Sequence, residues 1–104
     1  MANLEIEKIR EAVQENKIEI SGHAKRRMGM RKIKFREVIE IILAGEIIEQ
    51  TPKTQPFPKC LILGFVREKE PLYVSCAFNG DTVYIITVHW HDPEKWIDPW
   101  TRKE

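Results

Sequence analysis

The chain has 104 residues, of which 42% are hydrophobic and 32% are charged, and its formal net charge is +1. That length allows one domain with one modest core, and the composition is typical of a globular protein. No apolar stretch approaches the about 18 residues of a membrane span, and the N-terminus lacks the pattern of a secretory signal. We therefore expect a single cytoplasmic domain, residues 1–104, that does not span a membrane.

Three helices are predicted in the first part of the chain. Apolar residues recur at helical spacing in the first, which Asn3 is suited to cap, and Ser21 has the character of an N-cap for the second. The third has one apolar stripe and ends at Gly45, a glycine free to take a positive φ. The three predicted helices cover about residues 4–15, 22–29 and 36–44.

After Gly45 the pattern becomes strand-like, with segments rich in Ile, Val, Tyr and Phe between turn signals. The predicted strands cover about residues 46–50, 59–66, 72–78 and 82–90, and an extended tail covers 91–104. The segment Ile18–Ile20 is either a short strand or an extended link. In the last strand, strict alternation places Val83, Ile85, Thr87 and His89 on one face of the sheet. The fold class is therefore α+β, with two or three helices packed on one face of a four-stranded antiparallel sheet.

The charge distribution is more informative than the net charge. Seven cations and no acid lie between Glu19 and Glu37: Lys25, Arg26, Arg27, Arg31, Lys32, Lys34 and Arg36. A local basic face indicates an anionic partner, of which nucleic acid is the commonest. The alternative is a solvated helix surface. If the partner is nucleic acid, the residues expected to contact RNA are Lys25, Arg26, Lys32 and Lys34.

His23 and Arg27 are four residues apart, so a helix places the imidazole and the guanidinium on the same face, with Arg31 one turn further on. A histidine can transfer a proton near neutral pH, and a planar cation can stabilise charge that builds on a phosphate. Such a cluster has the parts needed to break an RNA backbone without a metal or another cofactor. The competing interpretation is that His23 caps a turn and the arginines face solvent.

Other residue types leave alternatives open. His89 and His91, with Asp92 beside them, are possible zinc or nickel ligands, but spacing sets no third strong ligand, so no metal site is predicted. Cys60 and Cys76 are interpreted most simply as small buried hydrophobic residues; they could be cross-strand neighbours, but a reducing cytoplasm argues against a standing disulfide. Three tryptophans, Trp90, Trp96 and Trp100, could stack on bases. For Trp90 and Trp96 we expect instead that they cover the end of a small core.

The run SGHAKRRMGMRKI, a helix ending in LAGEIIE, and the strands PKCLILGF, PLYVSCAF and VYIITVHWHDPEKW together resemble a known family over residues 21–96. It is the family of small cytoplasmic domains often encoded beside YgiT-type (MqsA-like) zinc-finger antitoxins. Its histidine, alanine, Arg-Met and second arginine correspond to His23, Ala24, Arg27, Met28 and Arg31, and its strand threonine to Thr87.

The family is grouped with RelE-like and barnase-like RNase toxins, so the resemblance implies helices on an antiparallel sheet. It implies the toxin of a type II toxin-antitoxin system, with RNA and a zinc-finger antitoxin as partners. His23 would transfer the proton, Arg27 and Arg31 would hold the scissile phosphate, and Thr87 would add a hydrogen bond. The alternative is a noncatalytic module of the same fold that binds RNA or a protein.

Overall fold

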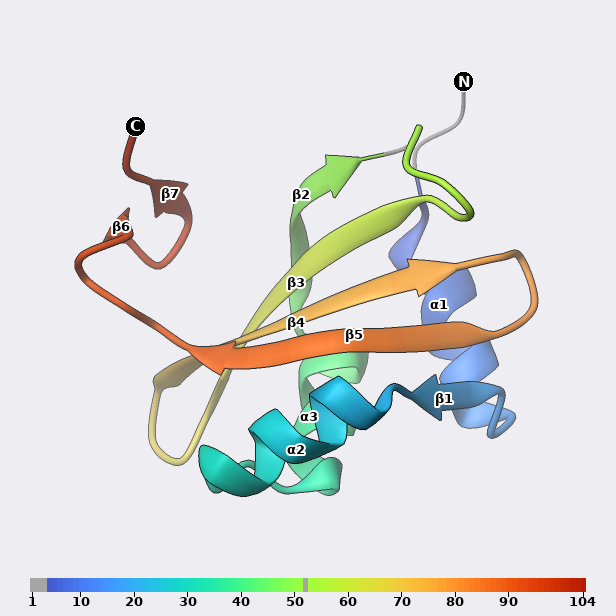
Figure 1. Ribbon diagram of the computed structural model, residues 1–104, viewed down its shortest axis with the longest axis horizontal. Helices are drawn as coiled ribbons and strands as arrows, with labels where there is room; N and C mark the ends of the chain where they lie inside the picture. Colours follow the sequence, from blue (N-terminus) through green and yellow to red (C-terminus); the bar gives the residue numbers. More distant parts are fainter. Residues whose placement is uncertain (1–3, 52) are drawn as a thin grey trace.

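The computed structural model describes residues 4–51 and 53–104, and within these ranges the chain forms three helices, a five-stranded sheet and a two-stranded sheet. The helices are α1 Ile6–Gln14, α2 Gly22–Met30 and α3 Phe35–Ala44. The strands of the large sheet are β1 Ile18–Ile20, β2 Glu46–Thr51, β3 Lys59–Val66, β4 Glu70–Phe78 and β5 Val83–Trp90. Their order across the sheet is β1-β5-β4-β3-β2, as Figure 1 shows.

The α+β class is confirmed, and the four predicted strands form the expected antiparallel meander, but the sheet has five strands and not four. The segment that was either a strand or a link is β1, and it pairs in parallel with β5, with Ile18 opposite Val83 and Ile20 opposite Ile85. The other neighbours in the sheet are antiparallel. A strand of three residues is too short to show a clear alternation of its own. The partner that makes it a strand lies more than 60 residues further along the chain, where no local pattern can point to it.

The start of α2 is fixed by local chemistry. The Ser21 hydroxyl accepts a hydrogen bond from the Ala24 amide at 3.0 Å and so caps the helix, as predicted. The expected cap at Asn3 lies outside the described residues. Gly45 does not take a positive φ; its φ is −84°. It is needed for another reason, since a Cβ there would lie 2.5 Å from the Ile41 carbonyl oxygen and would also collide with the Leu63 carbonyl.

The two faces of the large sheet are covered differently. One face packs against all three helices and forms the main core, to which α1 contributes Ile9, α2 Met28 and α3 Ile42. The opposite face, which we call the open face, carries a small apolar cluster of Leu61, Leu63, Tyr73 and Trp96. The C-terminal segment, red in Figure 1, supplies this tryptophan and lies away from the helices.

A β-bulge in β5 decides which side chains reach the open face. Ser75 of β4 pairs with Thr87, while the next residue, Cys76, pairs with Ile85, so Ile86 is an extra residue on β5. The predicted strict alternation is therefore wrong. Val83, Ile85 and Val88 pack into the main core, whereas Thr87 and His89 lie on the open face.

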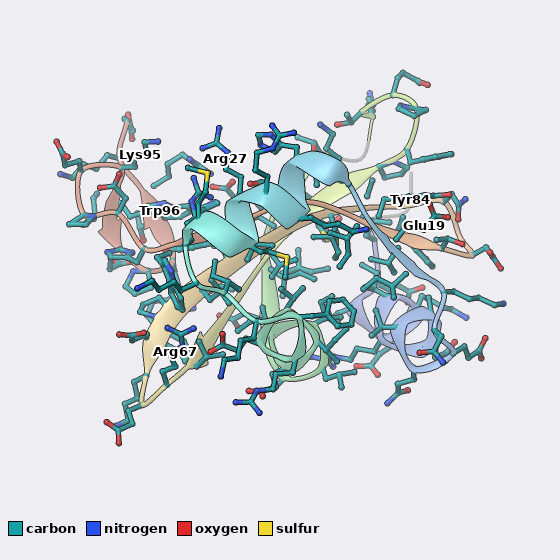
Figure 2. All side chains as sticks on the ribbon, turned by 60° about the horizontal axis from the view of Figure 1, so that its bottom comes forward. Glu19, Arg27, Arg67, Tyr84, Lys95 and Trp96 are labelled. Atoms are coloured by element: carbon teal, nitrogen blue, oxygen red, sulfur yellow. The ribbon has the colours of Figure 1, made fainter. Side chains whose placement is uncertain are left out.

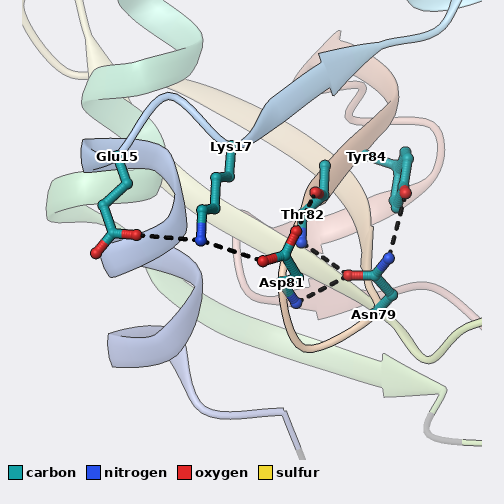
Figure 3. Close-up of polar contacts among 6 residues, drawn as sticks. All are labelled: Glu15, Lys17, Asn79, Asp81, Thr82 and Tyr84. Carbon is teal, nitrogen blue, oxygen red and sulfur yellow. Dashed lines mark hydrogen bonds and ion pairs between the residues drawn. The ribbon is translucent and has the colours of Figure 1, made fainter.

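The turn between β4 and β5 is built from the predicted NGDT segment and is tied to the end of α1. Asn79 Oδ1 accepts from the amides of Asp81 at 2.8 Å and Thr82 at 2.7 Å, and Gly80 has a φ of 94°. Lys17 lies between Asp81 and Glu15, with its Nζ 3.1 Å and 3.4 Å from their carboxylate oxygens (Figure 3). This network fixes the β4–β5 turn to the end of α1, at the end of the molecule that lies far from the C-terminal segment.

The C-terminal tail is more ordered than predicted. Its strands β6 Trp96–Asp98 and β7 Thr101–Arg102 form a small hairpin in which Trp96 pairs with Arg102. Trp96 is buried, as expected for a residue that covers a core. Trp90 is half-buried against the main core. The cross-strand placement of Cys60 and Cys76 is confirmed; both thiols are free, with their Sγ atoms 3.7 Å apart.

Candidate functional site

The open face carries a pocket of about 320 Å³ at the end of β5. We call it the cationic pocket because three of its side chains are basic and one is acidic. Its lining residues come from the end of α2, from β5 and from the C-terminal segment: Arg31, Thr87, His89, Trp90, Asp92, Lys95, Trp96 and Arg102. The excess of positive charge favours an anionic ligand.

Arg31 enters the pocket because the end of α2 is attached to β5. It is the C-cap residue of α2, and its guanidinium donates to the Val88 carbonyl at 2.6 Å. In return, Trp90 Nε1 donates to the Arg31 carbonyl at 3.0 Å. These reciprocal bonds fix the arginine against the strand that carries Thr87 and His89.

Arg102 reaches the pocket from the C-terminal hairpin. Its guanidinium lies over the Trp96 ring, 4.5 Å from the centroid, and makes two hydrogen bonds to the Glu49 carboxylate at 2.9 and 2.8 Å. Trp96 itself stacks on Tyr73, with ring centroids 4.6 Å apart. The hairpin is therefore held on the open face by aromatic packing and by one bidentate ion pair.

His89 is the titratable side chain at the centre of this arrangement. Burial lowers the pKa of its imidazole, and the positive charges of Arg31, Arg102 and Lys95 lower it further, against a contact with the Trp90 carbonyl that raises it. His89 Nδ1 lies 3.4 Å from that carbonyl oxygen, a weak contact that favours a proton on Nδ1 and a lone pair on Nε2. The environment therefore favours a neutral imidazole, which can accept a proton near neutral pH.

Tyr73 lies beneath the histidine and connects it to the C-terminal segment. Its hydroxyl donates to the Pro99 carbonyl at 2.6 Å and lies 3.1 Å from His91 Nδ1. Burial raises the pKa of Tyr73 to about 12, so it stays protonated at neutral pH. Its role in the site is to position its neighbours through stacking and hydrogen bonding.

The predicted catalytic residues fall into two groups. Arg31 and Thr87 lie together in the cationic pocket. His23 does not line that pocket; it is exposed in the first turn of α2. Arg27 is half-buried, and Figure 2 shows it on the side of α2 toward Lys95 and Trp96. The predicted RNA-contacting residues Lys25, Arg26, Lys32 and Lys34 are all exposed.

Sequence reasoning missed His89, Lys95 and Arg102 as parts of one site. The HWHD segment did single out His89, but as a possible metal ligand. Strict alternation on β5 also grouped it with Val83 and Ile85, which are buried in the main core. Lys95 and Arg102 belonged to a tail without periodicity, and no local pattern could show that it folds back onto the sheet.

Residues 20–90 match the family described as Domain of unknown function (DUF4258). The chain belongs to this family. The matched region contains Arg31, Thr87 and His89, and it ends before Lys95 and Arg102. No curated protein and no solved structure matches the chain.

Two further observations concern the described residues alone. None of the helices within residues 4–51 and 53–104 has the length and apolar content needed to cross a membrane. In the same ranges, no three side chains of His, Cys, Asp or Glu are grouped so as to hold a metal ion.

Proposed function

We propose that this DUF4258 protein is a metal-independent endoribonuclease and the toxin of a toxin-antitoxin pair. The observation that carries the proposal is the cationic pocket, in which His89 lies with Thr87 and with the cations Arg31, Lys95 and Arg102. A base-competent imidazole beside several fixed cations is suited to break a phosphodiester.

In the proposed reaction His89 Nε2 takes the proton from the 2′-hydroxyl of the substrate. The 2′-oxygen then forms a bond to phosphorus, and the bond from phosphorus to the 5′-oxygen breaks, leaving a 2′,3′-cyclic phosphate and a 5′-hydroxyl. Lys95 supplies the proton to the leaving oxygen, because a lysine can release a proton and an arginine in practice cannot. Arg31 and Arg102 stabilise the charge on the phosphate, and Thr87 adds a hydrogen bond to the bound nucleotide.

This assignment gives the base role to His89, whereas the family resemblance gives it to His23. A direct comparison separates them: purified protein is incubated with a mixed RNA substrate, with and without a chelator, as His89→Ala and as His23→Ala. Loss of a general base lowers the rate by about 10²- to 10⁴-fold. We expect that loss for His89→Ala and a change within a few-fold for His23→Ala, both insensitive to chelator.

Each variant must melt near the parent temperature, so that lost activity is not lost fold. The opposite ranking of the two histidines would move the site to the exposed face of α2. Cleavage that disappears with chelator in the parent protein would contradict the metal-independent mechanism.

The toxin assignment also draws on the fold and the charged surface. Three helices on one face of a mainly antiparallel sheet are consistent with a RelE-like or barnase-like architecture. A zinc-finger antitoxin that presents acids would bind the exposed cations of α2 and of the segment after it, which we call the α2 surface: Lys25, Arg26, Lys32 and Lys34. A protein that cuts cellular RNA would act in the cytoplasm.

The antitoxin surface can be tested by charge reversal. Lys25→Glu with Arg26→Glu should weaken the complex with the co-expressed antitoxin, and Lys8→Glu with Lys69→Glu, two exposed lysines elsewhere, should not. Arg10 is unsuitable as a control because it donates to the Ile42 and Gly45 carbonyls and holds α1 in place. Equal losses from both pairs would place the antitoxin on another surface.

A second candidate function is a noncatalytic module that binds RNA or a protein. The exposed cations favour it, Lys25 and Arg26 on α2 and Lys32 and Lys34 just beyond its end, because these side chains can hold a polyanion without any catalytic group. Retention of RNA by the purified protein with no cleavage of any substrate would support this alternative over the nuclease.

A further inference from the structure

A second hollow of about 250 Å³ lies on the open face and is unexplained by the proposed chemistry. We call it the side pocket. Three of its lining residues, Thr87, His89 and Arg102, also line the cationic pocket. The two hollows are therefore adjacent and meet at the proposed catalytic histidine, so one extended ligand can occupy both.

The side pocket differs from the cationic pocket in its chemistry. Leu61, Ser75 and Thr87 form one row across β3, β4 and β5, because Leu61 pairs with Ser75 and Ser75 pairs with Thr87. The row thus sets a largely buried leucine at the wall of the pocket beside two hydroxyls. Among the described residues, neither hydroxyl has a hydrogen-bond partner, although both side chains are half-buried. Polar groups in such a position are available to a ligand.

One cation flanks the row on the side away from Arg31. Lys59 lies one position along β3 from Cys60, lines the side pocket, and makes no ion pair within the described part of the chain. The open face therefore carries, in order, a cationic pocket, a half-apolar pocket with two free hydroxyls, and an isolated lysine. In a nucleic acid strand each sugar between two phosphates carries one base, so cations on either side of a half-apolar hollow suit two successive phosphates and the base between them.

We propose that the side pocket binds the nucleobase on the 5′ side of the scissile phosphate, with Ser75 and Thr87 hydrogen-bonding its edge and Lys59 contacting the phosphate on the 5′-oxygen of that nucleoside. This inference rests on the proposed nuclease function and adds a substrate class to it. A base seated against Leu61 cannot remain paired and stacked in a duplex, so the substrate is single-stranded RNA. Ser75 is then a specificity-determining residue that acts on the base and leaves the reacting atoms untouched.

The experiment measures binding separately from cleavage. The full-length protein is titrated by NMR with each of the four nucleoside 3′-monophosphates and with inorganic phosphate. We expect one or two bases to bind more tightly, with shifts at Leu61 and Ser75. Ser75→Ala should weaken binding of the preferred nucleotide about three- to tenfold, the range for one hydrogen bond, and leave inorganic phosphate binding unchanged.

Two further variants keep the test decisive if Ser75→Ala perturbs β4. Thr87→Val removes the second hydroxyl at nearly constant shape and should weaken the same nucleotide by a similar factor. Lys59→Ala should weaken a dinucleotide with two phosphates more than a mononucleotide, whereas Lys69→Ala, in the β3–β4 turn, should change neither.

Cleavage of a short single-stranded RNA library completes the test. A shift in base preference on Ser75→Ala, with the overall rate on the best sequence retained within tenfold, supports the side pocket. Equal binding of all four nucleotides, together with no effect of Ser75→Ala or Thr87→Val, would overturn it even if the protein cuts RNA. Selective binding that depends on Ser75, without any cleavage, would support the side pocket while removing the nuclease function.

Discussion

The rings of Tyr73 and His89 stack almost in parallel, with centroids 5.0 Å apart and planes inclined by 11°. The two residues pair directly across β4 and β5, so the register of the sheet sets the position of the imidazole. Trp96 stacks on the same tyrosine and brings the C-terminal hairpin to the site. The proposed base is thus held by a regular strand and not by a loop.

Replacing Tyr73 tests how much this stack contributes. Tyr73→Phe keeps the ring but removes the hydroxyl bond to the Pro99 carbonyl, and we expect a loss of about 1 kcal/mol in the free energy of unfolding. Tyr73→Leu also removes the stacking and should cost about 2–4 kcal/mol. Denaturant unfolding measures both. RNA cleavage should survive in Tyr73→Phe within a few-fold and fall further in Tyr73→Leu; equal cleavage by both would show that the stack does not position His89.

His89 should make stability depend on pH. Its pKa in the folded protein is lowered, chiefly by burial, whereas in the unfolded chain it has the ordinary value of about 6.5. Between these two values the unfolded chain binds more protons, so the free energy of unfolding falls as the pH falls below about 6.5. His89→Gln should reduce this dependence. An unchanged pH profile for His89→Gln would show that the imidazole titrates as it does in the unfolded chain.

Glu37 should contribute a separate loss of stability in acid. Hydrogen bonds from Arg67, with Arg67 Nε 2.7 Å from one carboxylate oxygen, lower the pKa of the Glu37 carboxyl below its usual value of about 4.3. This stability is fully present above about pH 4.3 and is lost as the pH falls through the lowered pKa. Arg67→Ala should therefore lower stability at neutral pH and weaken its acid dependence. Arg36→Ala, an exposed arginine on the same helix, is the control, and equal melting temperatures for the two variants would contradict the prediction.

Two glycines should respond to alanine in opposite directions. Gly45→Ala forces a Cβ against the Ile41 and Leu63 carbonyls, and we expect a loss of about 1–3 kcal/mol. Gly29 lies in the last turn of α2, and a Cβ added there would meet nothing within 4 Å, so Gly29→Ala should raise stability by up to about 1 kcal/mol through higher helix propensity. Thermal or denaturant unfolding gives both values. Destabilisation by Gly29→Ala would mean that α2 ends earlier than the structure has it.

The α2 surface should bind RNA in a manner that depends on salt. For a single strand, each phosphate contact contributes about −0.7 to the slope of log affinity against log salt concentration, so removing one contact makes the slope shallower by about 0.7. Lys25→Ala with Arg26→Ala should therefore reduce the slope by about 1.4 if each contacts one phosphate. The control is Lys8→Ala with Lys69→Ala, which should leave the slope unchanged. Affinity that does not vary between low and physiological salt would argue against a polyanion surface.

Local chemistry in the sequence was sufficient for most of the secondary structure. The apolar stripe of Phe35–Ala44, the Ser21 cap and the turn at Asn79 each depend on residues within a few positions of one another. The four long strands were also predictable, because their β-branched and aromatic residues alternate between turn signals. The same local reading identified a basic face, since all its cations lie within 12 residues.

The position of the site depended on contacts between distant parts of the chain. The bulge at Ile86 places Thr87 and His89 on the open face, and it exists only in the pairing of β5 with β4. The C-terminal hairpin brings Lys95 and Arg102 to His89 because Trp96 packs on Tyr73, 23 residues away in the sequence. Side-chain period and capping act over one or two turns of chain, whereas register and packing are set by partners that only the folded sheet brings together.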